Sequence, residues 1–165
     1  MKLDTQDKVF MRRAINLAKQ GSRKSDSTPI GCVIVLDDEV IGEAHNEVEA
    51  SCDPTAHAEI VSMRRAGKLL HRSQFKGAIL YSTLQPCGMC TMASIWSGIS
   101  RIVYGAERDQ VHPMYFEGRH FNTIDFILDA FRKDIRVEGG LCDLECAALY
   151  YRPNDEPPNG EQANI

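Results

Sequence analysis

Apolar residues recur at helical spacing in the first segment of the chain. A spacing of three to four residues predicts an amphipathic helix from about Asp4 to Gln20, because such residues share one helix face. Its apolar members are Val9, Phe10, Ala14, Leu17 and Ala18. Gly21 follows, and glycine commonly ends a helix. A polar loop then leads to the next apolar run.

The next segment changes to runs of β-branched residues. Two apolar runs, residues 30–36 and 40–45, lie on either side of the acidic sequence at residues 37–39. Runs of this kind around a short turn predict a β-hairpin. We expect a loop over residues 47–55, where the periodicity is lost.

The rest of the chain alternates between helical spacing and short apolar runs. Helices are predicted over residues 56–66, 87–96, 123–132 and 141–151, and strands over 78–82, 102–105 and 135–137. We expect Gly67 to end the first of these helices, and Pro86 to stand where the second begins, since proline has no N–H to leave unsatisfied there. Residues 106–122 are predicted to be irregular. Alternation after an initial hairpin predicts an α/β fold, a three-layer α/β/α sandwich around a mixed sheet.

Length and composition limit the class of protein. The chain has 165 residues, of which 43% are hydrophobic and 25% charged, as expected for a soluble globular protein. We expect one domain over residues 1–151 and a flexible tail over residues 152–165, which are rich in Pro, Asn and Glu. No apolar run approaches the roughly 20 residues of a membrane-spanning helix. The first residues lack the apolar stretch of a signal peptide, so we expect a cytoplasmic protein with no membrane association.

The net charge changes the expected partners. It is −4 at pH 7, and no basic stripe is evident along the sequence. Proteins that bind nucleic acid usually carry a basic excess, because phosphate contacts dominate their affinity. The charge therefore argues against a nucleic-acid partner, without excluding one.

The cysteines indicate metal or redox chemistry. The chain has six cysteines, at positions 32, 52, 87, 90, 142 and 146. A disulfide framework would require a secreted protein, which the first residues do not suggest. Cys87 and Cys90 are three residues apart at a predicted helix start, so their sulfurs share one face. The positive end of the helix dipole favours their thiolate form, which binds metal.

A histidine and a glutamate complete the predicted site. With His57, the two cysteines give three protein ligands, the number that a catalytic zinc site needs if its fourth position is to receive water. We therefore expect one Zn²⁺ per chain. Glu59 is two residues from His57, so it does not face the same way on a helix and is not expected to be a fourth ligand. It is instead the predicted catalytic residue, a carboxylate that carries protons between water, substrate and the leaving amine.

These two motifs, HAE at residues 57–59 and PCGMC at residues 86–90, carry a family resemblance. The pairing of H-x-E with P-C-x-x-C is the signature of zinc-dependent deaminases. From about Asp7 to Tyr150 the chain resembles the cytidine deaminase-like superfamily, in the branch of cytosine, guanine and tRNA-adenosine deaminases. The resemblance implies a mixed five-stranded sheet between helices, a homodimer or higher oligomer, zinc ligation by the three residues above, and substrate contact by Asn46.

The segment around Trp96 bears on the substrate. Residues 94–99 look like those of bacterial guanine deaminases, and the negative net charge agrees with a small-molecule nucleobase. We therefore expect deamination of guanine to xanthine and ammonia. Cytosine, a triazine, a nucleoside or adenosine in tRNA stay as alternatives. Trp96 is expected either to stack on the substrate ring or to fill the core, and Asp125 is a candidate for contact with the substrate amino group.

A second class of function uses the same residues differently. A Cys-x-x-Cys pair also occurs in structural zinc sites and in redox pairs. A closed structural site would need a fourth ligand, with Cys52 or His45 as candidates, and would leave Glu59 without a role. The alternative is then a non-catalytic, zinc-stabilised binding domain, and substitution of Glu59 separates it from a deaminase.

Overall fold

A mixed sheet forms the centre of the structure, a computed structural model that describes residues 4–23, 28–116, 125, 127 and 134–156. Five strands make up this sheet within those residues. They are β1 (Gly31–Leu36), β2 (Glu39–His45), β3 (Ile79–Leu84), β4 (Arg101–Ala106) and β5 (Arg136–Glu138). Their spatial order is β2-β1-β3-β4-β5.

The sheet combines an antiparallel half with a parallel half. β1 pairs antiparallel with both β2 and β3, whereas β3–β4 and β4–β5 are parallel pairs. The hairpin between β1 and β2 is confirmed: Asp37 and Asp38 both have positive φ, as a two-residue turn between twisted strands requires. Parallel pairing needs crossover connections, and α4 supplies the one between β3 and β4.

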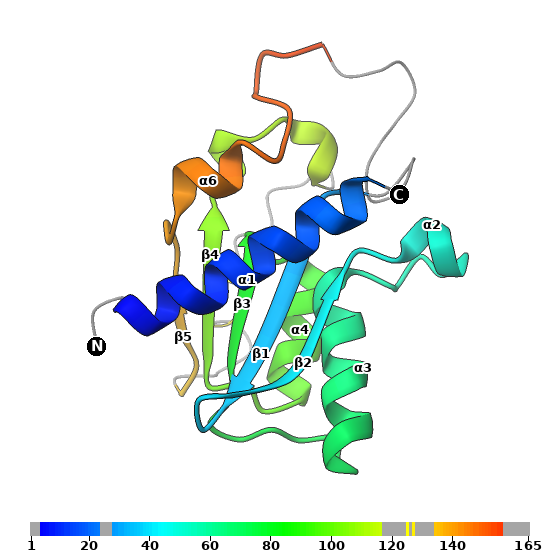
Figure 1. Cartoon of the computed structure of the whole chain (residues 1–165), viewed down its shortest axis with the longest axis vertical. Helices are drawn as coiled ribbons and strands as arrows, with labels where there is room; N and C mark the ends of the chain where they lie inside the picture. The colour runs from blue at the N-terminus through cyan, green and yellow to red at the C-terminus, as the bar shows by residue number, and fades with distance from the viewer. Residues whose placement is uncertain (1–3, 24–27, 117–124, 126, 128–133, 157–165) are drawn as a thin grey trace.

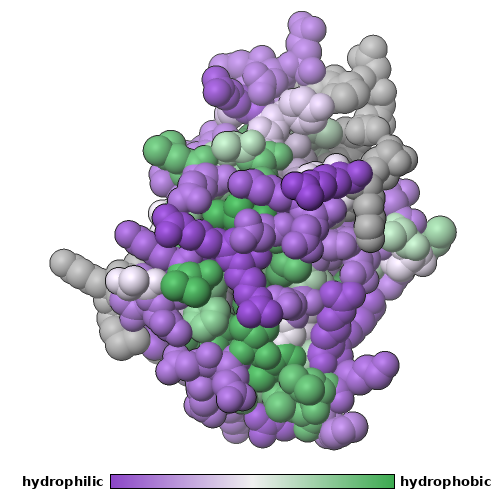
Figure 2. All heavy atoms as spheres, in the orientation of Figure 1, coloured by the Kyte–Doolittle hydropathy of each residue, from purple (hydrophilic) through white to green (hydrophobic). Residues whose placement is uncertain are grey.

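Helices cover both faces of the sheet, which confirms the predicted three layers (Figure 1). α1 (Thr5–Ser22) lies across β1 and β3, and α6 (Asp143–Ala147) packs on β4 on the same side. α3 (Ala58–Leu70) and α4 (Gly88–Trp96) lie behind the sheet. Two 3-10 turns, Arg108–Gln110 and Pro113–Tyr115, follow β4. The outward surface of α1 is mainly hydrophilic (Figure 2), as expected for an amphipathic helix.

Two predicted helix ends are wrong, and both involve glycine. α1 continues through Gly21 to Ser22. A Cβ at Gly21 would lie 2.9 Å from the Cβ of His45, so a residue with a side chain would clash there. Glycine there allows α1 to approach the end of β2. α3 continues through Gly67 to Leu70 and ends where His71 adopts a left-handed conformation. Local helix-stop chemistry was overridden by tertiary packing in the first case and by a different cap in the second.

Three other segments differ from their predictions. The expected loop at residues 47–55 contains a short helix, α2 (Val48–Ser51). The last helix is shorter than predicted, since α6 spans Asp143–Ala147 and starts after Cys142, which has positive φ. Pro86 does not open α4, because Cys87 is the N-cap and has extended backbone angles. Most of the helix expected at residues 123–132 lies outside the described residues, as does the tail beyond residue 156.

The topology brings several chain segments to one edge of the sheet. β3 and β4 end there, β1 begins there, and β2 ends there because it pairs antiparallel with β1. α3 and α4 have their first turns at the same edge. Ligands of open α/β sheets bind beyond the carboxyl ends of the strands, where loops and helix N-termini meet. We refer to this edge, with His57 and Cys87 at the two helix starts, as the site edge.

A buried ionic cluster lies away from the site edge. The Arg101 guanidinium, at the start of β4, donates to both carboxylate oxygens of Asp7, at 2.8 and 2.9 Å, and also pairs with Glu138 on β5. The hydroxyl of Tyr81 donates to Asp7 at 2.7 Å. The Asp7–Arg101 cluster, as we call these four residues, ties α1 to three strands.

No helix among the described residues is long and apolar enough to span a membrane.

Candidate metal centre and catalytic residue

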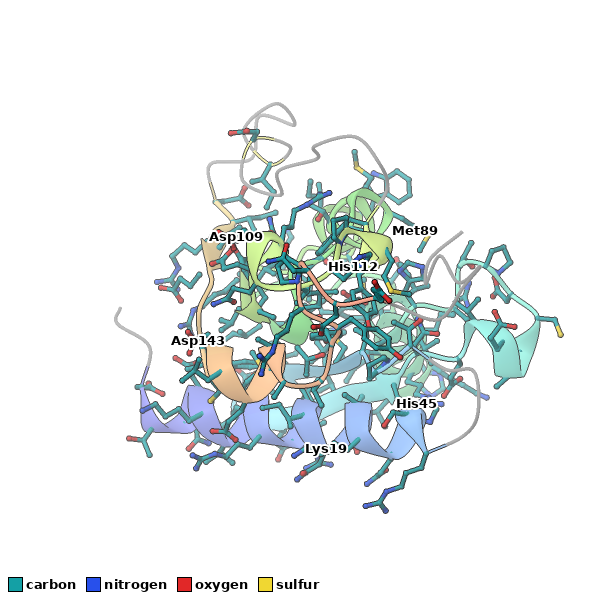
Figure 3. The ribbon with its side chains drawn as sticks, turned by 90° about the horizontal axis from the view of Figure 1, so that it is seen from above. Lys19, His45, Met89, Asp109, His112 and Asp143 are labelled. Carbon is teal, nitrogen blue, oxygen red and sulfur yellow. The ribbon has the colours of Figure 1, made fainter. Side chains whose placement is uncertain are left out.

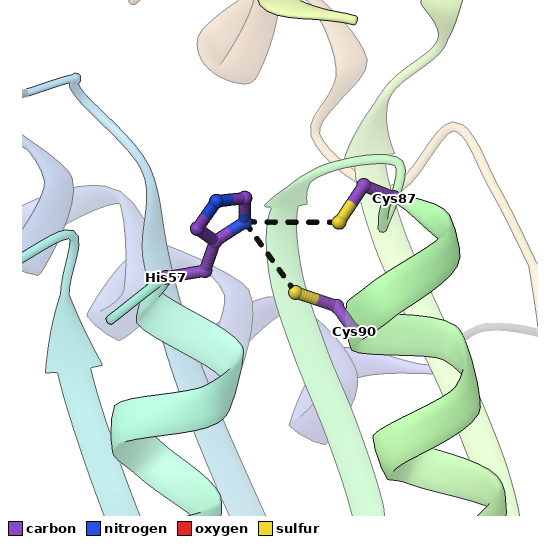
Figure 4. A group of neighbouring side chains, drawn as sticks. All are labelled: His57, Cys87 and Cys90. Carbon is purple, nitrogen blue, oxygen red and sulfur yellow. Dashed lines mark hydrogen bonds between the residues drawn. The ribbon is translucent and has the colours of Figure 1, made fainter. Parts of the chain in front are cut away.

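Three side chains from two helix starts converge at the site edge (Figure 4). His57 is the N-cap of α3, Cys87 is the N-cap of α4, and Cys90 lies in the first turn of α4. The Nδ1 of His57 is 3.7 Å from the Sγ of Cys87 and 3.6 Å from the Sγ of Cys90. Their ligand atoms all lie within 4.8 Å of one another, and the three side chains are buried.

This geometry fits a tetrahedral zinc ion. With Zn–N of about 2.1 Å and Zn–S of about 2.3 Å, two ligand atoms at a tetrahedral angle are about 3.6 Å apart. The observed N–S separations of 3.6 and 3.7 Å match that value. Among the described residues, His57, Cys87 and Cys90 form the group of three or more His, Cys, Asp or Glu side chains whose ligand atoms lie close enough together to hold a metal ion. The set supplies three ligands, which leaves one tetrahedral position for a non-protein ligand.

The two thiols differ in their affinity for protons. Hydrogen bonding from Cys90, and then from His57, lowers the pKa of Cys87 to about 4. Burial and the neighbouring Cys87 thiolate raise the pKa of Cys90. Zinc binds the thiolate form of cysteine, so metal binding by this pair releases protons.

Glu59 lies beside the ligands in the first helical turn of α3 and is 3% exposed. Its Oε1 accepts a hydrogen bond from the hydroxyl of Ser82, at 3.1 Å. Its Oε2 is buried and has no hydrogen-bond partner among the described residues. Burial raises the pKa of Glu59, and the charge of Cys87 raises it further. A buried carboxyl with a raised pKa and one oxygen available can both accept and return a proton.

Asn46 follows β2 at the site edge and is 2% exposed. Its Oδ1 accepts from the N–H of Val48 at 3.1 Å, and its own N–H donates to the carbonyl of Ile30 at 3.0 Å. The first contact is a side-chain turn of the kind that Asn commonly makes. It fixes the side chain where the chain leaves the sheet, next to the start of α2.

The other two predicted substrate contacts are Trp96, which lies away from the centre, and Asp125. Trp96 is the last residue of α4, at the opposite end from Cys87, and roughly 12 Å along the axis from Gly88 at 1.5 Å per residue. It is 72% exposed, so the expectation that it fills the core is wrong, because its side chain lies on the outer face of α4. Asp125 is helical and exposed, and the residues on both sides of it lie outside the described part.

Two polar residues near the centre were missed by the sequence analysis. Ser82 holds Glu59, as above, and Thr83 accepts a hydrogen bond from the N–H of Gly31 at 3.1 Å and shares one of 2.7 Å with the Tyr150 hydroxyl. Both are fully buried at the end of an apolar strand. Two adjacent hydroxyl residues ending an apolar run were the available signal, since buried polar groups need partners.

The surroundings of the site edge are mixed in charge. Figure 3, a view from above, shows Lys19, His45, Asp109 and Asp143 around it, drawn from different segments of the chain. Met89, which lies between the two cysteine ligands in the sequence, is 36% exposed.

Comparison with known proteins places this site in a family. The sequence profile of the cytidine and deoxycytidylate deaminase zinc-binding region matches residues 4–106, which include the three ligands and Glu59. A tRNA-specific adenosine deaminase of Bacillus subtilis is 41% identical over 147 residues, which are 88% of this chain and 86% of that protein. Guanine deaminase of the same organism is 41% identical over 99 residues, 60% of this chain and 64% of that protein.

Comparison with solved structures supports the same family. A structure from studies of A-to-I editing by tRNA:A34 deaminases superposes with a TM-score of 0.73 at 33% identity, and covers 86% of this chain and 98% of that one. The structure of guanine deaminase from Bacillus subtilis gives a TM-score of 0.59 at 41% identity over 61% of this chain and 64% of that one. The expected fold and zinc cofactor are thus confirmed. The chain belongs to the family of the cytidine and deoxycytidylate deaminase zinc-binding region, and is a deaminase of the branch that includes tRNA-adenosine and guanine deaminases.

Proposed function

We propose that this deaminase acts on an aminopurine, with free guanine, converted to xanthine and ammonia, as the first candidate. The observation that carries the hydrolytic chemistry is the buried Oε2 of Glu59, which has no protein partner among the described residues, beside a three-ligand zinc site. The net charge of −4 supports an uncharged free base, rather than a polyanion, as the substrate. The cytoplasmic location expected from the sequence stays a prediction.

The residues of the site have separate tasks in this proposal. His57, Cys87 and Cys90 would hold the metal, which when bound would lower the pKa of a water molecule and so supply a nucleophile. Glu59 accepts a first proton from the attacking water at Oε2 and delivers it to a ring nitrogen. It then takes the second proton from the hydroxyl group now on the ring carbon and passes it to the departing amine. Ser82 keeps the carboxylate oriented through Oε1. Water adds to the ring carbon and ammonia leaves, so the net change is one amino group replaced by one carbonyl.

Asn46 is the proposed substrate contact. Its burial at the end of β2 and its fixed turn keep the side chain in one orientation. Such preorganisation suits a group that positions a planar base for attack. The proposal assigns no substrate contact to Trp96. Contact between Asp125 and the substrate amino group stays a prediction.

Adenosine in tRNA is the second candidate, and a specific observation favours it. The tRNA-specific adenosine deaminase of Bacillus subtilis matches 88% of this chain, whereas the guanine deaminase matches 60%. The first likeness therefore extends over more of the chain than the second. Both candidates are aminopurines, so the chemistry assigned to Glu59 is the same.

A panel of substrates distinguishes the candidates. Ammonia release is measured with guanine, cytosine, adenine, guanosine, cytidine, isocytosine and ammeline, and inosine formation is measured with tRNA. Release from guanine with little dependence on salt is expected for a free base. Activity confined to tRNA, falling steeply as salt rises, would replace guanine by the second candidate. Activity on none of them would overturn the aminopurine proposal.

We also propose that the chain forms a homodimer through the outer face of α4. Met89, Met92, Ala93 and Trp96 lie at positions i, i+3, i+4 and i+7, so they form one stripe on the helix. Met89 and Trp96 are exposed, Met92 and Ala93 are partly buried against the core, and exposed apolar side chains on one helix face are typical of an interface. Light scattering should give twice the chain mass for the native protein and the chain mass for Trp96→Glu; a monomeric native protein would contradict the dimer.

A further inference from the structure

Cations line the outer face of α3 close to the site edge. Arg64, Arg65 and Lys68 contribute to the wall of an open hollow of about 230 Å³ between α3 and the α2 segment. The other lining residues are Glu47, Ser51, Asp53, Ala56 and Val61. Three cations beside an active site would ordinarily offer contacts to the phosphates of a nucleic acid.

The two arginines are held by carboxylates of the same hollow. Arg65 donates to the Oε1 of Glu47 at 2.6 Å and to the carbonyl of Glu43 at 2.7 Å. Arg64 donates to the Oδ2 of Asp53 at 3.0 Å and to the hydroxyl of Thr55 at 2.9 Å. Each guanidinium thus has two of its donor nitrogens engaged within the protein.

Asp53 is itself fixed in place. Its Oδ1 accepts from the N–H and the hydroxyl of Thr55, at 2.8 and 2.6 Å. These hydrogen bonds, and then Arg64, lower the pKa of Asp53, so its negative charge persists throughout the neutral range. A phosphate entering the hollow would meet guanidinium groups that are about half exposed but already paired with carboxylates.

The paired residues adjoin the proposed site directly. Glu47 follows Asn46, and Ala56 precedes His57. The N–H of Glu47 donates to the carbonyl of Ala56 at 3.0 Å, which joins the two segments. Figure 1 shows α2 extending from the end of β2 on the side of α3. A nucleotide flanking a base at the metal centre on this side would have its phosphate beside these ion pairs.

We propose that Glu47 and Asp53 are specificity-determining residues, which hold Arg65 and Arg64 in ion pairs at the site edge and so exclude polyanionic substrates in favour of free bases. This inference rests on the proposed free-base function and names the residues that enforce it. The carboxylates occupy arginine donors that phosphate would use, and they cancel the positive charge of the two guanidinium groups. Like charges brought together across an interface are an established means of rejecting a wrong partner.

The test compares two double variants of the zinc-loaded protein. The hollow variant, Glu47→Gln with Asp53→Asn, loses the two negative charges at the hollow and keeps side chains that still accept hydrogen bonds. The turn variant, Asp38→Asn with Glu39→Gln, loses two negative charges at the β1–β2 turn at the far end of the sheet, where both residues are exposed. Binding of a fluorescent single-stranded RNA of mixed sequence is measured by anisotropy over a range of salt, alongside ammonia release from guanine.

The hollow variant should bind the RNA about tenfold more tightly than either the native protein or the turn variant. Its affinity should fall with a log–log salt slope about 1.4 steeper, as expected for two added phosphate contacts at about 0.7 each. Adding Arg64→Gln and Arg65→Gln to the hollow variant should abolish the gain. Equal RNA binding by the hollow and turn variants, or a gain that survives loss of both arginines, would overturn the inference.

This design distinguishes failure of the free-base proposal from failure of the proposed exclusion by Glu47 and Asp53. Absence of ammonia release from guanine by the native protein, together with the predicted gain in RNA binding, would remove guanine as substrate and keep the exclusion by Glu47 and Asp53. Release from guanine without any gain in RNA binding would remove only the exclusion. Tight RNA binding by the native protein would contradict the exclusion directly.

Discussion

Two buried polar clusters in this fold contain ionisable groups, and they differ in how completely those groups are satisfied. In the Asp7–Arg101 cluster, both carboxylate oxygens of Asp7 accept from the guanidinium, Tyr81 adds a third hydrogen bond, and Glu138 pairs with the same guanidinium. At the site edge, Glu59 has one oxygen engaged by Ser82 and the other without a partner among the described residues. Both carboxylates are about 3% exposed.

The difference separates a structural role from a chemical one. Burial opposes ionisation of Asp7, but its hydrogen bonds with Arg101 and Tyr81 outweigh that, and its pKa is lowered. Burial raises the pKa of Glu59, and the charge of Cys87 adds to the effect. An unsatisfied buried carboxylate lowers stability, and its place beside the candidate metal ligands agrees with the proposed role of the available oxygen toward water or substrate.

Glu59→Gln is expected to have the largest effect on turnover. The amide keeps the size of the side chain and an acceptor for Ser82 but cannot carry a proton. Loss of a general acid–base should lower the turnover number by about 10²–10⁴-fold. Steady-state ammonia release measures this, and zinc content and thermal melting should match the native protein. Retention of native turnover would refute the role of Glu59, whereas a native protein without turnover would favour the non-catalytic binding domain.

Asp7→Asn is expected to have the largest effect on stability. It leaves the charge of Arg101, which is 2% exposed, without its main partner. Removing one member of a buried ion pair costs about 3–5 kcal/mol in the free energy of unfolding. Urea unfolding measures the loss, with Glu145→Gln as control. That change breaks the exposed Arg12–Glu145 pair, at 3.5 Å, and should cost about 0–1 kcal/mol. Equal losses of unfolding free energy in the two variants would contradict the distinction between the buried and the exposed ion pair.

Acid should reduce the difference in the free energy of unfolding between the native protein and Asp7→Asn. Because the folded-state pKa of Asp7 is lowered, its contribution to stability is fully present above the unfolded pKa of about 3.9. That contribution is lost as the pH falls through the lower, folded pKa. The gap in unfolding free energy between the two proteins should therefore be constant from pH 7 to about pH 5 and shrink below pH 4. A gap that widened in acid would contradict the sign of the shift.

Ser82→Ala should have the smallest effect of the series. It removes the hydrogen bond to Oε1 of Glu59, and such bonds to charged groups contribute about 1.5–3 kcal/mol. We expect turnover to fall by about tenfold, with zinc content unchanged. Ser82→Thr, which restores a hydroxyl, should recover part of the loss. Unchanged turnover in Ser82→Ala would show that Glu59 is oriented without this bond.

The sequence predicted what is encoded locally. The hairpin follows from two apolar runs around Asp37 and Asp38, and the ligand set follows from motifs of three and five residues. Both depend on short-range chemistry, in which residue type and spacing decide the geometry. Cys87 and Cys90 face one point because the N-cap and first turn of any helix place them so.

The features that were not predicted depend on contacts between distant residues. Arg101 and Asp7 are 94 positions apart in the sequence, and neither has a local pattern that identifies its partner. Gly21 resembles a helix stop, yet its role is set by His45 on another element. Trp96 was expected in the core or on the substrate, but the direction of α4 places its side chain outside. Long-range packing decides each case.

The most direct test of the central claim is the zinc K-edge X-ray absorption spectrum of the purified protein, normalised to protein concentration. One zinc per chain is expected, with two sulfur ligands at about 2.3 Å and lighter ligands at about 2.0–2.1 Å, one of them from His57. Cys90→Ala should reduce the sulfur contribution or remove the metal. Three or more sulfur ligands, or native protein that is active without zinc, would contradict the account.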